Sequence, residues 1–115
     1  MEIIGKEIKV VVDRPLGSTH PKHKNIVYGV NYGYTPDFIG GDGEEQDVYL
    51  LGVDFPISET NATVIAVIHR LDDNEDKWVA APNGTTFTAE QIMETVNFQE
   101  KYFKSTLITS KKENL

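Results

Sequence analysis

The sequence predicts a mainly β domain, either a small barrel or a sheet curled on itself, that ends in one α-helix. Short β-branched segments recur along the chain between glycine-rich or acidic turns. These segments come first and a single helical pattern comes last, which indicates one layered domain. The chain has 115 residues, so we expect one domain over residues 1–115, with a frayed polar tail at about 111–115.

The first half of the chain contains three expected strands. Residues 8–12 form the first, which ends at the turn residues of 13–17. Residues 26–34 form a second strand interrupted by glycines, and glycines in a strand pattern indicate bends or close approach of another backbone. The turn at 40–46 then leads into a third strand at 47–53.

The second half supplies a hairpin and the helix. A polar connection at 56–63 precedes a strongly β-branched segment at 64–71, which has the composition of a central strand. The acidic turn around Asp73-Asn74-Glu75 is the best hairpin signal, and residues 77–82 return as the next strand. Thr88 and Gln91 match a capping box, and the apolar spacing that follows predicts a helix ending near Lys104.

Composition limits the partners and the location. The formal net charge is −7, and an acidic surface disfavours nucleic acid and anionic membranes as partners. No cysteine is present, which excludes disulfides and thiolate metal sites. No apolar run reaches membrane-spanning length and no secretory leader is recognised, so we expect a cytoplasmic protein. Homo-oligomerisation stays open.

Two groups of acidic residues lie at the ends of expected apolar strands, one over 37–47 and the other over 72–76. If these strands are neighbours, the two groups converge, and gathered carboxylates raise one another's pKa unless a cation relieves the repulsion. Oxygen-only ligands favour Mg²⁺, Mn²⁺ or Ca²⁺ over zinc. Solvated acidic turns explain the same spacing without any ligand, and spacing alone favours that explanation.

Cations and tyrosines accompany the acidic groups. Arg14, Lys22, Lys24 and Lys77 stand beside glycine-rich or acidic turns, where they could neutralise a phosphoanhydride or form weak surface ion pairs. The tyrosines of 28–34 alternate on one face, where they could pack in the core or donate a hydrogen bond to a phosphate oxygen.

As a set, these segments resemble the soluble family I inorganic pyrophosphatases. The family's Asp-rich motif is matched by "DGEEQDV" at 42–48, and "YGVNYGY" at 28–34 is similar to its Tyr-Pro-x-Asn-Tyr-Gly-Tyr segment. Downstream, "DDNEDKWVAAP" at 72–82 and "FQEKYFK" at 98–104 resemble its later motifs. The resemblance covers roughly residues 26–104 and implies a closed five-stranded, OB-like barrel, in one pyrophosphatase-like domain, with Mg²⁺-dependent hydrolysis of pyrophosphate.

The resemblance also implies site residues. Metal-binding acids of the family are matched by Asp42, Asp47, Asp72 and either Glu75 or, after a one-residue shift, Asp76. Phosphate-binding groups are matched by Lys77, Tyr28 and Tyr102, with Arg14 as the best match for the family's arginine, Lys22 or Lys24 as stand-ins for a lysine, and Lys104 as a late lysine partner. Asn31, Tyr32 and Gly33 match a structural "NYG" element.

The sequence departs from the family pattern at several positions. Glu44 stands where the family has an aspartate proposed to help activate the attacking water, and its extra methylene moves the carboxylate by about 1.5 Å. Misplacement by ~1 Å can cost about 10²-fold in rate. The acidic loop at 72–77 is shorter than usual, and no counterpart of an N-terminal glutamate is found.

The expected function is hydrolysis of inorganic pyrophosphate to two phosphates. Two or more Mg²⁺ or Mn²⁺ ions would lower the pKa of a bridging water, and Glu44 and Asp47 are the expected catalytic residues. The resulting hydroxide would attack one phosphorus in line with the leaving phosphate. Two alternatives stay open: a non-catalytic module of the same fold that binds a metal-phosphate or a nucleotide, and a hydrolase of another phosphoanhydride.

Overall fold

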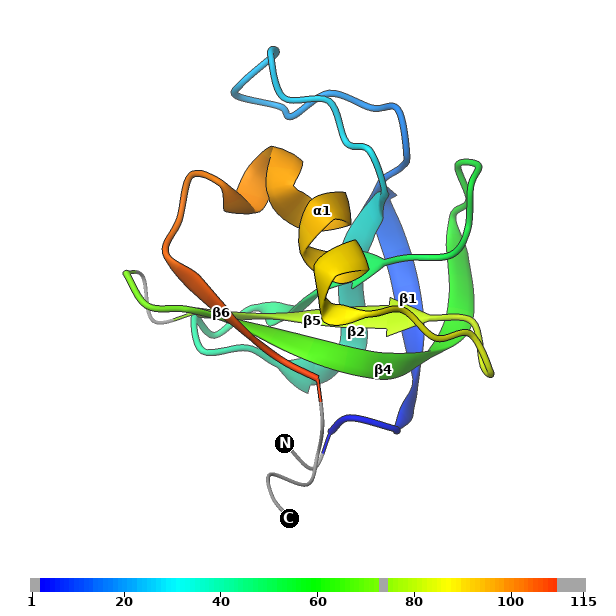
Figure 1. Ribbon diagram of the computed structural model, residues 1–115. Coiled ribbons are helices and arrows are strands. Elements are labelled where there is room, and N and C mark those ends of the chain that lie inside the picture. Colours follow the sequence, from blue (N-terminus) through cyan, green and yellow to red (C-terminus); the bar gives the residue numbers. More distant parts are fainter. Residues whose placement is uncertain (1–2, 73–74, 110–115) are drawn as a thin grey trace.

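A computed structural model describes residues 3–72 and 75–109 of the chain. It contains six strands and one helix in the described residues (Figure 1). Their bounds are β1 Glu7–Arg14, β2 Asn31–Ile39, β3 Glu45–Leu50, β4 Glu59–Arg70, β5 Glu75–Ala81, α1 Ala89–Glu100 and β6 Ser105–Ile108.

The first five strands form a closed barrel, as predicted. The sheet runs in the order β1-β2-β3-β5-β4, and an additional pairing of β1 with β4 closes the ring. The first part of β1 pairs with β4 and the part from Val11 onward pairs with β2, so one strand joins both sides of the ring. β3 and β5 pair in parallel, whereas the other pairs are antiparallel. β6 lies outside the ring and pairs with β4.

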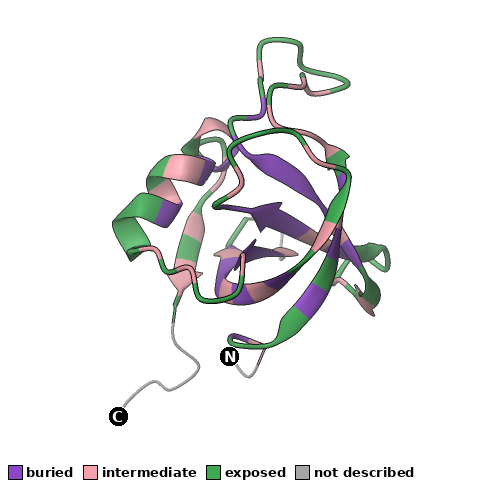
Figure 2. Cartoon of the chain, turned by 90° about the vertical axis from the view of Figure 1, so that its right-hand side faces the viewer, coloured by how far each residue is buried: buried purple, intermediate pink, exposed green. Residues whose placement is uncertain are grey.

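Apolar side chains pack in two layers. Alternation along the strands sends Val10, Val48 and Val64 into the interior of the barrel, where they are fully buried. Tyr49 and Val79 lie in the second layer, which also contains the buried residues of α1. Figure 2 shows the buried residues concentrated on the strands, while the connecting loops are mostly exposed. No helix among the described residues is long and apolar enough to cross a membrane.

The start of α1 follows the sequence prediction. The Thr88 hydroxyl accepts a hydrogen bond from the Gln91 N–H at 3.1 Å, and the Gln91 side chain accepts one from the Thr88 N–H at 2.8 Å. This reciprocal capping box satisfies two backbone donors that the first helical turn leaves without partners. Helix α1 ends at Glu100, before the predicted Lys104, and the chain then turns to form β6, which the sequence analysis missed.

Two strand boundaries also differ from the prediction. β2 begins at Asn31 rather than at residue 26, because residues 26–30 make only an isolated bridge between Val27 and Thr19. β4 begins at Glu59, inside the expected polar connection, because that polar part pairs with β1 and closes the barrel. The predicted hairpin is confirmed, because β4 and β5 pair antiparallel up to Arg70 and Glu75. Residues 73–74 of its turn and the expected frayed tail at 111–115 lie outside the described residues.

The "NYG" element holds the barrel wall together. Asn31 is fully buried, and its side chain accepts a hydrogen bond from the Leu16 N–H at 2.9 Å and donates one to the Phe55 carbonyl at 3.0 Å. A Cβ atom built on Gly33 would lie 1.8 Å from the Val11 carbonyl oxygen. The glycine therefore allows β1 to approach β2 closely, as the sequence pattern indicated.

Candidate functional site

A pocket of about 500 Å³ lies beside the barrel, where the segment 15–30, the ends of β4 and α1, and the α1–β6 connection meet. Cations from three different strands reach it: Arg14 from β1, Arg70 from β4 and Lys77 from β5. The remaining lining residues are His20, His23, Asn25, Ile26, Tyr28, Tyr32, Gln99, Tyr102 and Phe103. The pocket therefore combines fixed positive charge with rings and amides.

Sheet register decides which charged side chains meet in this region. In the parallel pair of β3 and β5, Val48 lies opposite Trp78, so Asp47 and Lys77 lie side by side. In the antiparallel pair of β4 and β5, Arg70 lies directly opposite Glu75. Asp47 and Lys77, which are 30 residues apart in the sequence, thus come together because their strands pair.

Lys77 is the centre of an acidic cluster. Its side chain is 6% exposed, and its ammonium group forms ion pairs with Asp47 and with Glu75, the latter at 3.0 Å. Burial by itself would lower the pKa of Lys77, but the nearby Tyr32 and Asp47 outweigh this effect and raise it. Lys77 therefore stays charged at any physiological pH.

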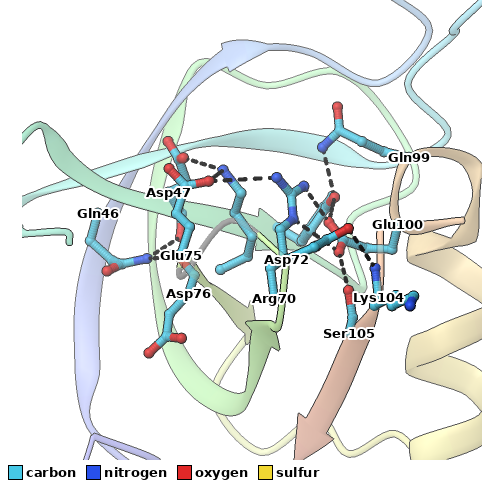
Figure 3. Close-up of polar contacts among 12 residues, drawn as sticks. Gln46, Asp47, Arg70, Asp72, Glu75, Asp76, Gln99, Glu100, Lys104 and Ser105 are labelled. Atoms are coloured by element: carbon cyan, nitrogen blue, oxygen red, sulfur yellow. Dashed lines mark hydrogen bonds and ion pairs between the residues drawn. The ribbon is translucent and has the colours of Figure 1, made fainter. Parts of the chain in front are cut away.

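Arg70 forms a second ion-pair cluster next to the first. Its guanidinium group donates two hydrogen bonds to Glu100, at 3.2 and 2.6 Å, and one to Glu75 at 3.5 Å (Figure 3). One face of the guanidinium lies 3.6 Å from the centre of the Phe103 ring. The side chains of Arg70 and Glu100 are 5% and 1% exposed. This bidentate geometry is typical of strong, directional arginine–carboxylate pairs.

A chain of hydrogen bonds, part-buried at Arg14 and buried from Tyr28 onward, connects Arg14 with Glu100. Arg14 donates a hydrogen bond to the Tyr28 hydroxyl at 3.2 Å, and the Tyr28 hydroxyl donates one to the side-chain oxygen of Gln99 at 3.0 Å. The Gln99 amide donates to the Tyr49 hydroxyl at 2.7 Å, and Tyr49 donates to Glu100 at 2.6 Å. Because Glu100 also holds Arg70, one satisfied network fixes two arginines that line the pocket.

The charge of Glu100 is stabilised by this network. Burial alone would raise the pKa of the Glu100 carboxyl, but hydrogen bonds from Arg70 and Tyr49 outweigh burial, so the pKa lies below its ordinary value. Tyr49 is affected in the opposite direction, since burial and the neighbouring Glu100 charge raise the pKa of its hydroxyl. The network therefore contains a carboxylate acceptor and a neutral phenol donor, which agrees with its hydrogen-bond directions.

The acidic turn between β2 and β3 is exposed. Asp42 accepts a hydrogen bond from the Glu44 N–H at 3.0 Å. This bond, together with an interaction with the Glu75 carboxyl, lowers the pKa of Asp42. Asp42 therefore lies near the cluster around Lys77, while the Glu44 side chain is exposed on the same turn.

Asp72 and Asp76 contact partners other than Lys77. The Asp72 carboxylate accepts a hydrogen bond from the Lys104 N–H at 3.3 Å, and Asp76 contacts the His69 imidazole at 2.7 Å. Alternation along β5 places Glu75 and Lys77 on one face and Asp76 on the other, and Figure 3 shows the Asp76 side chain pointing away from Glu75. Glu75, not Asp76, is thus the acid beside Lys77.

The described carboxylates do not form a resident metal site as they lie. Within residues 3–72 and 75–109, no group of three or more His, Asp or Glu side chains is placed to hold a metal ion. The reason is visible in the contacts: the Lys77 ammonium stands between Asp47 and Glu75, and Arg70 also holds Glu75. Metal binding by the acids that the resemblance implies therefore stays a prediction.

The predicted phosphate-binding residues separate into two sets. Arg14, Tyr28, Lys77 and Tyr102 line the pocket, whereas Lys22, Lys24 and Lys104 are exposed and do not line it. The Tyr28 hydroxyl gives its only proton to Gln99, so Tyr28 orients Arg14 in this arrangement. Sequence reasoning missed Arg70, Gln99 and Phe103 as pocket residues. Arg70 carried a usable signal, because it is a charge inside a β-branched strand just before an acidic turn.

Comparisons with known proteins support the fold. The chain matches the crystal structure of an inorganic pyrophosphatase from Ehrlichia chaffeensis with a TM-score of 0.71 and 19% identity, over 92% of this chain and 87% of that chain. An inorganic pyrophosphatase from Neisseria gonorrhoeae matches with a TM-score of 0.67 and 26% identity, over 85% and 74%. One from Helicobacter pylori matches with a TM-score of 0.66 and 17% identity, over 96% and 89%.

Comparison by sequence gives a different result: no family model matches the chain, and no curated protein does. The likeness is thus carried by three-dimensional structure. The chain has the fold of the bacterial inorganic pyrophosphatases.

Proposed function

We propose that the chain hydrolyses inorganic pyrophosphate to two phosphates, and that the substrate reaches the pocket as its Mg²⁺ or Mn²⁺ complex. The observation that carries the proposal is the convergence of Arg14, Arg70 and Lys77 on one pocket of a pyrophosphatase fold. Fixed cations of this kind stabilise charge that develops on phosphoryl oxygens during transfer. The cytoplasmic location expected from the sequence stays a prediction.

The charge balance of the pocket favours a metal complex over the free anion. Lys77 and Arg70 are already matched by Asp47, Glu75 and Glu100. Within the part of the chain that the structure describes, no carboxylate lies within ion-pair distance of Arg14. A substrate whose charge is partly cancelled by its own metal ion fits such a nearly neutral site, because it adds less repulsion to the carboxylates.

We assign the remaining roles from position and chemistry. Arg14 and Lys77 would hold phosphoryl oxygens, and Tyr102 would donate a hydrogen bond from the rim. Asp47 and Glu44 are the proposed acceptors for the proton of the attacking water, which approaches phosphorus opposite the leaving phosphate. Lys22, Lys24 and Lys104 remain weaker candidates for substrate binding. The acids proposed as metal ligands are Asp42, Asp47, Asp72 and Glu75 or Asp76.

Phosphate release tests this function. The parent chain and Asp47→Asn are compared with pyrophosphate in Mg²⁺ and in Mn²⁺, and circular dichroism confirms that both are folded. We expect turnover by the parent and a loss of roughly 10²-fold or more in Asp47→Asn, the size of effect that a displaced catalytic group produces. Glu59→Gln, an exposed acid at the start of β4, is the matched control. A folded parent without turnover in either metal would falsify the diphosphatase proposal.

One observation favours a second function, a non-catalytic module that binds a metal-phosphate or a nucleotide. Lys77 and Arg70 occupy the carboxylates that the resemblance assigns to metal binding. A site whose acids are already neutralised can bind an anion without activating water. Calorimetry distinguishes the two functions: heat of binding with Mg-pyrophosphate in the absence of phosphate release selects the binding module.

A further inference from the structure

The pocket is larger than a phosphoanhydride requires. Its volume is about 500 Å³, which falls within the range of roughly 300–1,000 Å³ that is typical of sites for drug-sized organic ligands. Pyrophosphate consists of only two phosphoryl groups. The additional space can accommodate an organic group that the ligand carries next to its phosphates.

The lining residues of the pocket are of two kinds, cations from the barrel strands and mostly uncharged side chains from the connecting segments. Arg14 and Lys77 stand on strands of the barrel, together with the polar network that orients Arg14. Further lining residues come from the segment 15–30 and from the α1–β6 connection: His20, His23, Asn25, Ile26, Tyr102 and Phe103. Apart from the two imidazoles, none of these six lining residues is an ionisable cation. They present rings, one amide and one aliphatic side chain.

Several of these rings have surface available for a ligand. Tyr102 is 54% exposed although it lines the pocket, and the Lys101 ammonium lies 5.4 Å from the centre of its ring. The Phe103 ring is covered more closely on one face by Arg70. The His20 ring lies nearly parallel to the Tyr28 ring, with 6.3 Å between ring centres and 8° between planes. The centres of the His20 and His23 rings are 4.9 Å apart. A planar aromatic group of a ligand can stack on such rings, and stacking tolerates any base because every base has a π-face.

We propose that the pocket binds a nucleoside diphosphate in preference to inorganic pyrophosphate, with the phosphates toward Arg14 and Lys77 and the base against Tyr102. The phosphate end of this inference rests on the proposed function. The base end rests on pocket size and on the exposed ring. The ligand supplies both parts of the chemistry: an anion for Arg14 and Lys77 and a flat apolar surface for the exposed ring.

Calorimetric titration of the full chain with Mg-ADP and with Mg-pyrophosphate tests the proposal. We expect ADP to bind at least about fivefold more tightly, since stacking of a base is worth about 1–3 kcal/mol, or roughly 5- to 150-fold. Tyr102→Ala should reduce the ratio of ADP affinity to pyrophosphate affinity by a factor in that range. Tyr102→Phe keeps the ring and should not lower the ratio, because loss of the hydroxyl removes only the hydrogen bond that the proposed function gives to pyrophosphate. Arg14→Ala should weaken both ligands.

The outcomes separate this inference from the proposed function. ADP binding no tighter than pyrophosphate binding, or a ratio unchanged in Tyr102→Ala, overturns the nucleotide inference even if pyrophosphate is hydrolysed. A Tyr102→Phe variant as weak as Tyr102→Ala also overturns it, because the hydroxyl and not the ring would then be the contact. Tight, ring-dependent ADP binding without release of phosphate from pyrophosphate supports the inference and removes the diphosphatase proposal.

Discussion

Arg70 and Glu100 form a buried, doubly hydrogen-bonded ion pair that joins the end of β4 to the last turn of α1. Ser105 at the start of β6 donates a further hydrogen bond to the same carboxylate at 2.9 Å. The pair therefore connects three elements at the wall of the pocket. It also fixes Glu100 as the terminal acceptor of the hydrogen-bond chain that begins at Arg14.

Removing the charge of Glu100 should destabilise the protein. In Glu100→Gln the guanidinium of Arg70 stays buried but loses its bidentate partner, and breaking one side of a buried ion pair costs roughly 3–5 kcal/mol. We expect a lower midpoint of urea unfolding with a decrease of about that size in the free energy of unfolding. Glu94→Gln, an exposed position on the same helix, is the control and should change stability by less than about 0.5 kcal/mol. Equal stability of Glu100→Gln and the parent would contradict the role given to the pair.

The same carboxylate should contribute to sensitivity to acid. The pKa of Glu100 in the folded chain lies below its ordinary value of 4.5, so its contribution to stability is complete above pH 4.5 and is lost as the pH falls through the lowered pKa. The difference in unfolding free energy between the parent and Glu100→Gln should be constant near neutral pH and shrink below about pH 4.5. Urea unfolding measured from pH 7 to pH 3 gives this difference. A difference that grows at low pH would show that the pKa is raised in the folded state.

Shortening Glu44 should increase turnover of pyrophosphate. Glu44 stands where the resembled family has an aspartate, and the exposed turn can accept the shorter side chain without loss of packing. We expect Glu44→Asp to raise kcat, by as much as about 10²-fold if the carboxylate is misplaced by ~1 Å in the parent. Glu45→Asp makes the same change at the next residue and should leave kcat within about twofold. A decrease in kcat for Glu44→Asp would mean that the glutamate is the better placed group.

Gly33 should not tolerate a side chain. A Cβ atom there would overlap the Val11 carbonyl oxygen at 1.8 Å, and only backbone movement in β1 could relieve the overlap. We expect Gly33→Ala to be strongly destabilised or unfolded, as judged by circular dichroism and limited proteolysis. Gly29→Ala, in the same segment, meets nothing within 4 Å and should fold normally. A folded Gly33→Ala with the stability of the parent would contradict the close approach of β1 and β2.

Local patterns in the sequence predicted the features that depend on a few neighbouring residues. The capping box at Thr88 and Gln91 is such a feature, because both hydrogen bonds form within one turn. The core of β4 is another, because a β-branched run indicates a strand wherever it lies. The close approach of β1 and β2 at Gly33 was also predicted, since a glycine inside a strand pattern indicates close approach of another backbone.

The arrangement of the charged pocket was decided by the tertiary structure. Asp47 meets Lys77 across 30 residues because β3 and β5 pair in parallel, and Glu100 meets Arg70 across 30 residues because α1 ends beside β4. Tyr28 accepts a hydrogen bond from Arg14 and donates one to Gln99, a contact that only the fold reveals, while binding of phosphate by Tyr28 stays a prediction. Residue type and spacing predicted many of the individual site residues, because the motifs that identify them are short stretches of chain. Which acid faces which cation depends on strand register and helix placement, and those follow from packing of the whole barrel.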